Sequence, residues 1–151
     1  MTQTSDIEIS VATEAAQEVV AAFARLLPQL SSSAKALRKE DIADIIAAPC
    51  NAVLLARDTL NAGAIVGTLT LVVFRIPTGT RAWIEDVVVD DAARGRGVGE
   101  RLTRKAIELA AQRGAQTVDL TSRPSREAAR RLYEKVGFRL RETGVYRYAI
   151  T

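Results

Sequence analysis

The sequence predicts an α/β (α+β) domain, a mixed and mostly antiparallel sheet of about seven strands flanked by about four helices. Apolar β-branched segments with turn residues between them predict hairpins in the middle of the chain. A helical pattern stands between two later strand segments, and such a pair of strands must run parallel. The predicted strands cover residues 7–11, 51–57, 64–75, 81–89, 116–121, 138–141 and 145–150. The predicted helices cover residues 14–27, 34–47, 97–113 and 125–136.

Local signals support the boundaries of these elements in order. Thr13 is a candidate N-cap for the first helix, and Pro28 ends or bends it. The second helix stops at Pro49. The long helix after the third hairpin strand carries an apolar stripe and ends at Gly114, a natural residue for a helix C-terminus. The whole chain, residues 1–151, is predicted to form a single domain.

Composition restricts the chemistry that this chain can perform. It has one cysteine, Cys50, and no histidine, so an internal disulfide and a thiolate metal cluster are excluded and no metal site is predicted. Acid–base chemistry then depends on carboxylates, tyrosine or water. The net charge of +3 is small and the arginines lie in helical patterns among acidic residues, so no nucleic-acid partner is expected. Because the N-terminus is polar and no apolar segment is long enough to span a bilayer, we expect a cytoplasmic protein that does not bind a membrane.

The segment from Val87 to Gly99 is the most informative in the chain. The apolar residues Val87, Val88 and Val89 indicate a buried strand, and a glycine-rich bend follows. A helix that starts directly after such a bend presents unpaired N–H groups and the positive end of its dipole, which together favour phosphate. The bend lacks the Gly-Lys-Ser/Thr ending of a Walker A loop. A Rossmann fingerprint is disfavoured because only one strand–helix–strand unit is visible and Asp119 falls in mid-strand.

Two motifs resemble the signatures of the GNAT N-acetyltransferases. The bend Arg94-Gly95-Arg96-Gly97-Val98-Gly99 is similar to that family's Arg/Gln-x-x-Gly-x-Gly/Ala acyl-CoA signature. The segment Ala129-Arg130-Arg131-Leu132-Tyr133, followed by Gly137-Phe138, resembles its second signature. Residues 84–89 resemble the family's fourth strand, so the resemblance covers about residues 64–150. Two signatures in the expected structural context are far more specific than either alone.

The resemblance implies acetyl-CoA as the donor and a GNAT fold with a central parallel pair of strands that splay apart to admit the pantetheine. The predicted cofactor-binding residues are Val87, Val88, Val89, Arg94, Gly95, Arg96, Gly97, Val98, Gly99, Ser125, Arg126 and Tyr133. Ser125 is also a candidate N-cap of the helix 125–136, and of these two roles the cap is favoured. Arg126 stands where many members have asparagine, and it could face a CoA phosphate or an anionic substrate.

The resemblance also implies direct attack of an amine on the thioester. An alkylammonium with a pKa of roughly 10 must first lose a proton, and the departing thiolate must gain one. Tyr133 is the predicted acid, with Tyr146 and Tyr148 as alternatives. Glu85 is the predicted base because a carboxylate in an otherwise apolar strand is costly unless it is wet, paired or functional. On a regular strand Glu85 shares a face with Val87 and Val89, and Asp86 points the other way; Asp86 or water could also be the base.

The predicted function is N-acetyl transfer from acetyl-CoA to a primary amine of a small molecule. A protein N-acetyltransferase and a non-catalytic acyl-CoA-binding module are the alternatives. Acceptor specificity is expected to come from the N-terminal helices with the loop 28–33, and from the hairpin 77–80. Because an exposed edge strand at residues 145–150 needs a cover, a homodimer is a further expectation.

Overall fold

The computed structural model describes residues 6–150, and the polar residues 1–5 of the sequence prediction lie outside this range. The described chain consists of two compact units, residues 6–121 and residues 122–150. The first unit contains the sheet and three α-helices, and the second contains one α-helix and the C-terminal segment. Each unit is described separately below.

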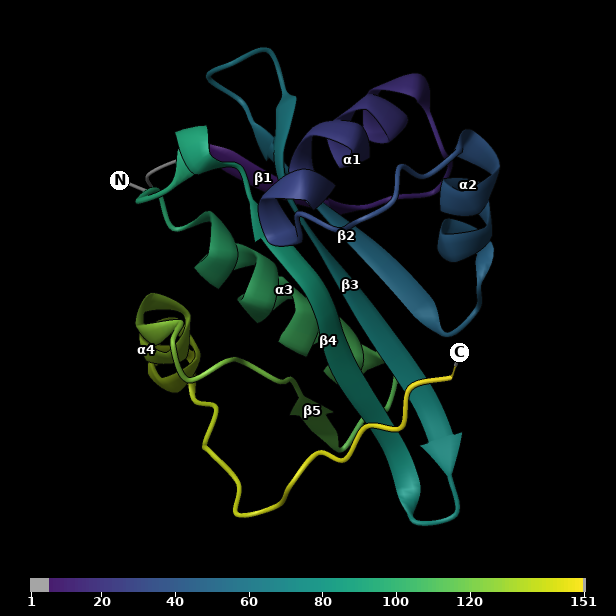
Figure 1. Cartoon of the computed structure of the whole chain (residues 1–151), viewed down its shortest axis with the longest axis vertical. Coiled ribbons are helices and arrows are strands. Elements are labelled where there is room, and N and C mark those ends of the chain that lie inside the picture. The colour runs from purple at the N-terminus through teal and green to yellow at the C-terminus, as the bar shows by residue number, and fades with distance from the viewer. Residues whose placement is uncertain (1–5, 151) are drawn as a thin grey trace. The chain divides into compact units, whose positions relative to one another are not determined.

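A five-stranded mixed sheet forms the centre of the first unit (Figure 1). Its strands are β1 (Ile7–Val11), β2 (Asn51–Asp58), β3 (Ala64–Ile76), β4 (Gly79–Val89) and β5 (Thr117–Asp119), in that order across the sheet. The first four strands pair antiparallel with their neighbours, and β5 pairs parallel with β4. The predicted mixed, mostly antiparallel sheet is therefore confirmed.

Helices cover both faces of this sheet, which buries the apolar strand residues on either side. On one face lie α1 (Gln17–Leu30) and α2 (Lys39–Ala47), whose apolar residues share a core with Val53, Leu55 and Val88 of the strands. On the other face lies α3 (Val98–Gln112), where Leu102 is fully buried. Gly67 of β3 makes this close packing feasible, because a Cβ there would lie 3.0 Å from Val98 and 3.2 Å from Leu102.

The first two helices begin later than the sequence predicts. Thr13 is not the N-cap of α1, because the helical hydrogen bonds begin at the carbonyl of Ala16, which accepts from Val19 and Val20. Pro28 lies inside the last turn, where its missing N–H removes one hydrogen bond close to the end of the helix. The second helix begins at Lys39 and not at residue 34, since a side-chain cap from Asp41 to the backbone of Arg38 fixes its start.

One irregularity interrupts the pairing of β3 with β4. Glu85 lies opposite Thr70 and Val88 lies opposite Thr68, so β4 carries an extra residue in this interval. Asp86 within it has a φ of 49°, in the left-handed region that residues other than glycine rarely adopt. This bulge reverses the alternation of side chains along the rest of β4.

The second unit consists of α4 (Glu127–Val136) and an extended segment after Gly137. The prediction of strands at residues 138–141 and 145–150 is wrong: residues 138–150 contain no strand, and the described sheet has five strands instead of about seven. The parallel pair consequently lies at the edge of the sheet and not at its centre. Strand formation requires a hydrogen-bonded neighbour, and an alternating pattern of side chains cannot supply one.

The described residues contain neither a membrane-spanning helix nor a cluster of metal ligands. No helix in this part of the chain is long and apolar enough to cross a membrane. Within the same range, no group of three or more His, Cys, Asp or Glu residues is placed to hold a metal ion.

Candidate active site

The glycine-rich segment between β4 and α3 is the first component of the candidate site. Asp90 ends the strand and caps a short 3-10 helix η1 (Asp91–Ala93), because its Oδ1 accepts a hydrogen bond of 3.2 Å from the N–H of Ala92. Gly95 and Gly97 then turn the chain with φ values of 81° and 76°. A Cβ at either glycine would meet nothing within 4 Å, so the space beside both residues is open. The segment can therefore accept a ligand against its backbone.

The backbone N–H groups of residues 95–99 have no partner among residues 6–150. The first intrahelical bond of α3 runs from the N–H of Arg101 to the carbonyl of Gly97. A row of free donors at the positive end of a 15-residue helix is the arrangement that binds phosphate groups.

The two arginines of this segment are held by acidic partners within the first unit. Arg96 contacts the carboxylate of Asp58 through two hydrogen bonds of 2.6 and 3.1 Å, and Asp58 is only 6% exposed. Arg94 lies 2.9 Å from the carboxylate of Asp91 at the surface. The sequence analysis predicted that both residues bind the cofactor pyrophosphate, chiefly through backbone N–H groups. The structure adds that each side chain already neutralises one carboxylate, which leaves the N–H groups of residues 95–99 as donors with no partner among the described residues.

The Asp58–Arg96 pair fixes the middle of the segment to the end of β2. The hydrogen bonds from Arg96 are the main cause that lowers the pKa of the Asp58 carboxyl below its usual value. The same carboxylate also accepts a bond of 3.0 Å from the N–H of Leu60. The sequence suggested only a turn at Asp58, and no pattern in it links this residue to Arg96.

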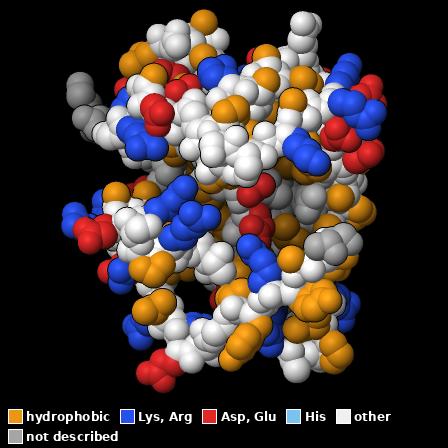
Figure 2. Space-filling model, viewed as in Figure 1, with side chains coloured by type: hydrophobic (Ala, Val, Ile, Leu, Met, Phe, Trp, Pro, Cys, Tyr) orange, Lys and Arg blue, Asp and Glu red, His pale blue; other side chains and the backbone are white. Residues whose placement is uncertain are grey.

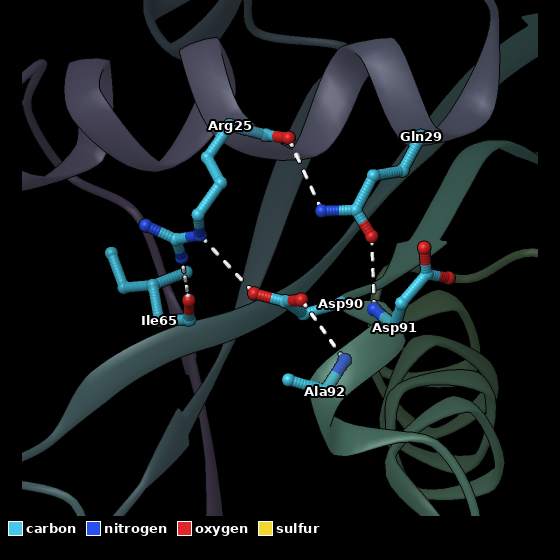
Figure 3. Close-up of polar contacts among 6 residues, drawn as sticks. All are labelled: Arg25, Gln29, Ile65, Asp90, Asp91 and Ala92. Atoms are coloured by element: carbon cyan, nitrogen blue, oxygen red, sulfur yellow. Dashed lines mark hydrogen bonds and ion pairs between the residues drawn. The ribbon is translucent and has the colours of Figure 1, made fainter.

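Side chains of α1 hold the beginning of the same segment (Figure 3). Arg25 donates from Nε to Asp90 at 3.1 Å and from Nη2 to the carbonyl of Ile65. Gln29, one turn further along α1, accepts a bond of 2.9 Å from the N–H of Asp91. Sequence reasoning missed Arg25 and Gln29, because their partners lie more than 60 residues away.

The second component of the candidate site is the edge of β4. Its parallel pairing with β5 ends where Trp83 lies opposite Asp119, so residues 84–89 have no strand partner on that side within the first unit. This is the separation of two parallel strands that the sequence analysis expected, although at the edge of the sheet. Val88 is 4% exposed and packs in the core, so only its backbone is available to a ligand, whereas Val87 and Val89 are half-buried.

Glu85 lies on the sheet face that carries α1 and α2, at a position that these helices leave exposed. The register shows this, because Glu85 and Val88 lie opposite Thr70 and Thr68, which point to one face. The predicted grouping of Glu85 with Val89 is wrong, because the bulge at Asp86 moves Val88 to the face of Glu85. Figure 2 shows acidic side chains at the surface over the middle of β4. No ion pair or hydrogen bond joins Glu85 to another described residue.

Tyr133 lies on α4 in the second unit, where its ring meets Phe138 edge-on with centroids 5.8 Å apart. Burial raises the pKa of the Tyr133 phenol, and the positive charge of Arg126 lowers it by less. The phenol is therefore protonated at neutral pH. Its hydroxyl makes no hydrogen bond to any residue of the described chain. That Tyr133 and Glu85 act at one site stays a prediction.

The start of α4 differs from the prediction. Its N-cap is Arg126, and no side chain caps the helix, so the expected capping role of Ser125 is wrong. Ser125 lies in the turn that precedes Arg126, whose N–H bonds to the carbonyl of Arg123 at 3.0 Å. Contacts of Ser125 and Arg126 with a cofactor stay predictions.

Comparison with known proteins identifies the family to which this arrangement belongs. Residues 14–138 match the model of the Acetyltransferase (GNAT) family. The chain is a member of the GNAT acetyltransferase family. The match includes both signature segments and the strand between them.

Individual relatives agree with this assignment. The chain is 36% identical to glucosamine 6-phosphate N-acetyltransferase 1 of Oryza sativa subsp. japonica, over 74% of this chain and 66% of that protein. It is 40% identical to the glucosamine 6-phosphate N-acetyltransferase of Trypanosoma brucei brucei, over 53% and 54% of the two chains. A crystal structure of a Trypanosoma brucei acetyltransferase has a TM-score of 0.77 and 27% identity, and the match covers 95% of this chain and 100% of that one. The chain thus spans about half to two thirds of these curated relatives.

GNAT acetyltransferases use acetyl-CoA, and the first unit fits such a ligand. The free N–H groups of residues 95–99 match the charge and acceptor oxygens of a pyrophosphate. The open space beside Gly95 and Gly97 leaves room for it. The unpaired edge of β4 offers main-chain groups to an extended amide chain such as pantetheine.

Replacing Gly97 with alanine tests whether the segment is a phosphate site. A Cβ at a φ of 76° costs about 1–2 kcal/mol, and relieving that strain would turn the free N–H groups out of line. We expect an approximately tenfold rise in the Kd for CoA, measured by calorimetry. Gly114→Ala is the matched control, since Gly114 at the other end of α3 has a φ of 84° and equally open space. Equal Kd changes in both variants would contradict the assignment.

Asp58→Asn tests the pair with Arg96 through its pH dependence. Because the folded state lowers the pKa of Asp58, the pair stabilises the fold above a pH of about 4 and is lost as the pH falls through the folded pKa. We expect the variant to unfold at lower denaturant concentration than the wild type at pH 7. The difference should shrink as the pH is lowered below about 4. Glu14→Gln, at an exposed carboxylate, should show no such trend; a constant difference for Asp58→Asn would refute the role of the pair.

Proposed function

We propose that this protein transfers an acetyl group from acetyl-CoA to the primary amine of a small molecule, with amino sugars as the acceptor class to test first. One observation carries the proposal: a row of N–H groups with no partner among the described residues follows a strand whose outer edge pairs with no described strand beyond Trp83. Such an arrangement suits a ligand that has a pyrophosphate at one end and amide groups along its length.

Acetyl-CoA, when bound, supplies the acetyl group in activated form as a thioester. The residues proposed to hold it are Val87, Val88 and Val89 through their backbones, and residues 94–99 chiefly through N–H groups. The contribution of this chain is to fix the donor against β4 and to handle two protons.

Glu85 is proposed to accept the proton of the acceptor ammonium, directly or through water. Its carboxylate is exposed and has no partner in the described chain, so it is free to take a proton. Tyr133 is proposed to donate the second proton to the leaving sulfur. Burial raises the pKa of the Tyr133 phenol, so at neutral pH the phenol carries the proton that this role requires.

The relatives support amino sugars as the acceptor class, and Glu85 lies exposed on a sheet face beside the expected helices. Two relatives are named as acetyltransferases of glucosamine 6-phosphate, an amino sugar. The face beside Glu85 is bordered by α1 and α2, the helices that the sequence analysis expected to select the acceptor. A cytoplasmic location and a homodimer stay predictions.

A panel of acceptors tests the proposal. Purified protein with acetyl-CoA is mixed with amino sugars and their phosphates, other small primary amines, or peptides with free N-termini, and free CoA thiol is measured. We expect turnover with at least one small amine, and amino sugars should give the highest kcat/KM. Turnover of peptides alone would show a protein acetyltransferase. Binding of CoA without turnover of any amine would show a non-catalytic module, and either result overturns the proposal.

Glu85→Gln tests the proposed base. The loss should be about a hundredfold in kcat/KM at neutral pH and smaller at high pH, where more of the free amine is already neutral. Asp86→Asn is the control, because Asp86 is the adjacent exposed carboxylate at the bulge. Because the variant then depends on the neutral fraction of the amine, its kcat/KM should rise more steeply with pH than that of the wild type. An unchanged profile would remove Glu85 from the mechanism, and a loss confined to Asp86→Asn would transfer the role to Asp86.

A further inference from the structure

We infer that Arg25 and Gln29 of α1 are positioning residues for the cofactor, because they set the backbone of residues 90–99 for anion binding through Asp90 and Asp91. The inference rests on the proposed use of acetyl-CoA. Neither side chain belongs to the motifs that resemble the family signatures, and neither is assigned to contact the cofactor.

The geometry places both contacts at the start of the segment. Arg25 bridges two strands, since its Nη2 bonds the carbonyl of Ile65 in β3 and its Nε bonds Asp90 at the end of β4. The N–H of Asp90 in turn bonds to the carbonyl of Val66 at 2.8 Å. Arg25 therefore holds Asp90 through its side chain while β3 holds the backbone. Figure 3 shows the contacts of Arg25 with Ile65 and Asp90, with α1 above the strands.

Gln29 holds the backbone of Asp91, and its own side chain is held by the carbonyl of Arg25. Its Oε1 accepts from the N–H of Asp91 at 2.9 Å, and its Nε2 donates to the carbonyl of Arg25 at 3.2 Å. The Asp90 carboxylate also accepts from Ala92. Three consecutive residues, Asp90 to Ala92, are thus held before the chain reaches Gly95. A backbone fixed at this point has fewer ways to turn the later N–H groups away from a ligand.

Arg25 also favours anion binding through its charge, because it neutralises a carboxylate next to the proposed site. Asp90 and Asp91 precede a segment proposed to bind a pyrophosphate, and unpaired carboxylates there would repel it. Arg25 pairs with Asp90, while Arg94 pairs with Asp91 at 2.9 Å. The hydrogen bond from Ala92 and the contact with Arg25 both lower the pKa of Asp90, so the carboxylate is charged at neutral pH and the pair is ionic.

The link also connects two parts of the proposed site. By register, α1 lies on the sheet face of Glu85, and the segment 90–99 begins at the end of the same strand. The position of residues 90–99 consequently depends on the orientation of α1, because the side chains of Arg25 and Gln29 join the two.

Arg25→Met tests the inference in the full-length protein, with CoA as the probe in calorimetry and steady-state kinetics alongside. We expect the Kd for CoA and the KM for acetyl-CoA to rise about tenfold, with kcat within twofold of the wild type. Arg25→Lys keeps the charge but cannot span both partners as the guanidinium does, so it should recover part of the affinity. Gln29→Met should raise the Kd by a smaller factor.

The controls separate positioning from loss of stability. Arg38→Met removes an exposed Arg–Asp pair at α2 and should leave the Kd for CoA unchanged. In a double-mutant cycle, Arg25→Met and Asp90→Asn should be non-additive for the Kd, because both break one link. A Kd for Arg25→Met within twofold of the wild type, an equal rise in Arg38→Met, or full additivity would overturn the inference. If wild-type protein does not bind CoA, the proposed function itself fails.

Discussion

The unequal pairing of β4 with its two neighbours is the constraint on which the candidate site depends. β3 pairs with β4 almost along its full length, whereas β5 pairs with it over three residues only. One edge of β4 is therefore rigidly held and the other is available over residues 84–89. Because the bulge at Asp86 lies within this interval, the same strand directs Glu85 to the face of α1 and α2 and leaves main-chain groups at the open edge.

The segment after β4 is rigid for a different reason. Regular secondary structure cannot hold a bend that must leave its N–H groups unpaired, so side chains from elsewhere in the first unit take this role. Arg25 and Gln29 hold its beginning, and Asp58 holds its middle through Arg96. Residues 95–99, whose N–H groups have no partner in the described chain, therefore include the second anchor and run from it into α3. Preorganised donors lose little freedom on binding, which increases affinity without any additional contact.

Part of this structure could be predicted from the sequence, because it depends on residues that are close together in the chain. The hairpin strands, the glycine bend and the helix after it depend on neighbouring residues, and all were located within a few residues. The bulge at Asp86 was not predicted, because an extra residue in a strand is defined only by its partner. The links of Arg25 to Asp90 and of Asp58 to Arg96 join residues 65 and 38 positions apart, and single residues of common type carry no signal over such distances. The C-terminal strands were predicted only from the alternation of apolar and polar side chains. That pattern does not show whether a neighbouring strand is available to pair with them.

The use of main-chain donors has a consequence for how this chain can vary. Every amino acid except proline has a backbone N–H, so side chains at residues 94, 96 and 98 can diverge without removing a donor. Arg94 and Arg96 are already paired with carboxylates, which further separates their identity from ligand recognition. Substitutions in the bend are then limited by backbone conformation at the two glycines with positive φ, by the burial of Val98 and by the need of the buried Asp58 carboxylate for a partner. Recognition through main-chain groups therefore places few demands on the side chain of residue 94, and selection for new acceptors can act elsewhere on the same scaffold.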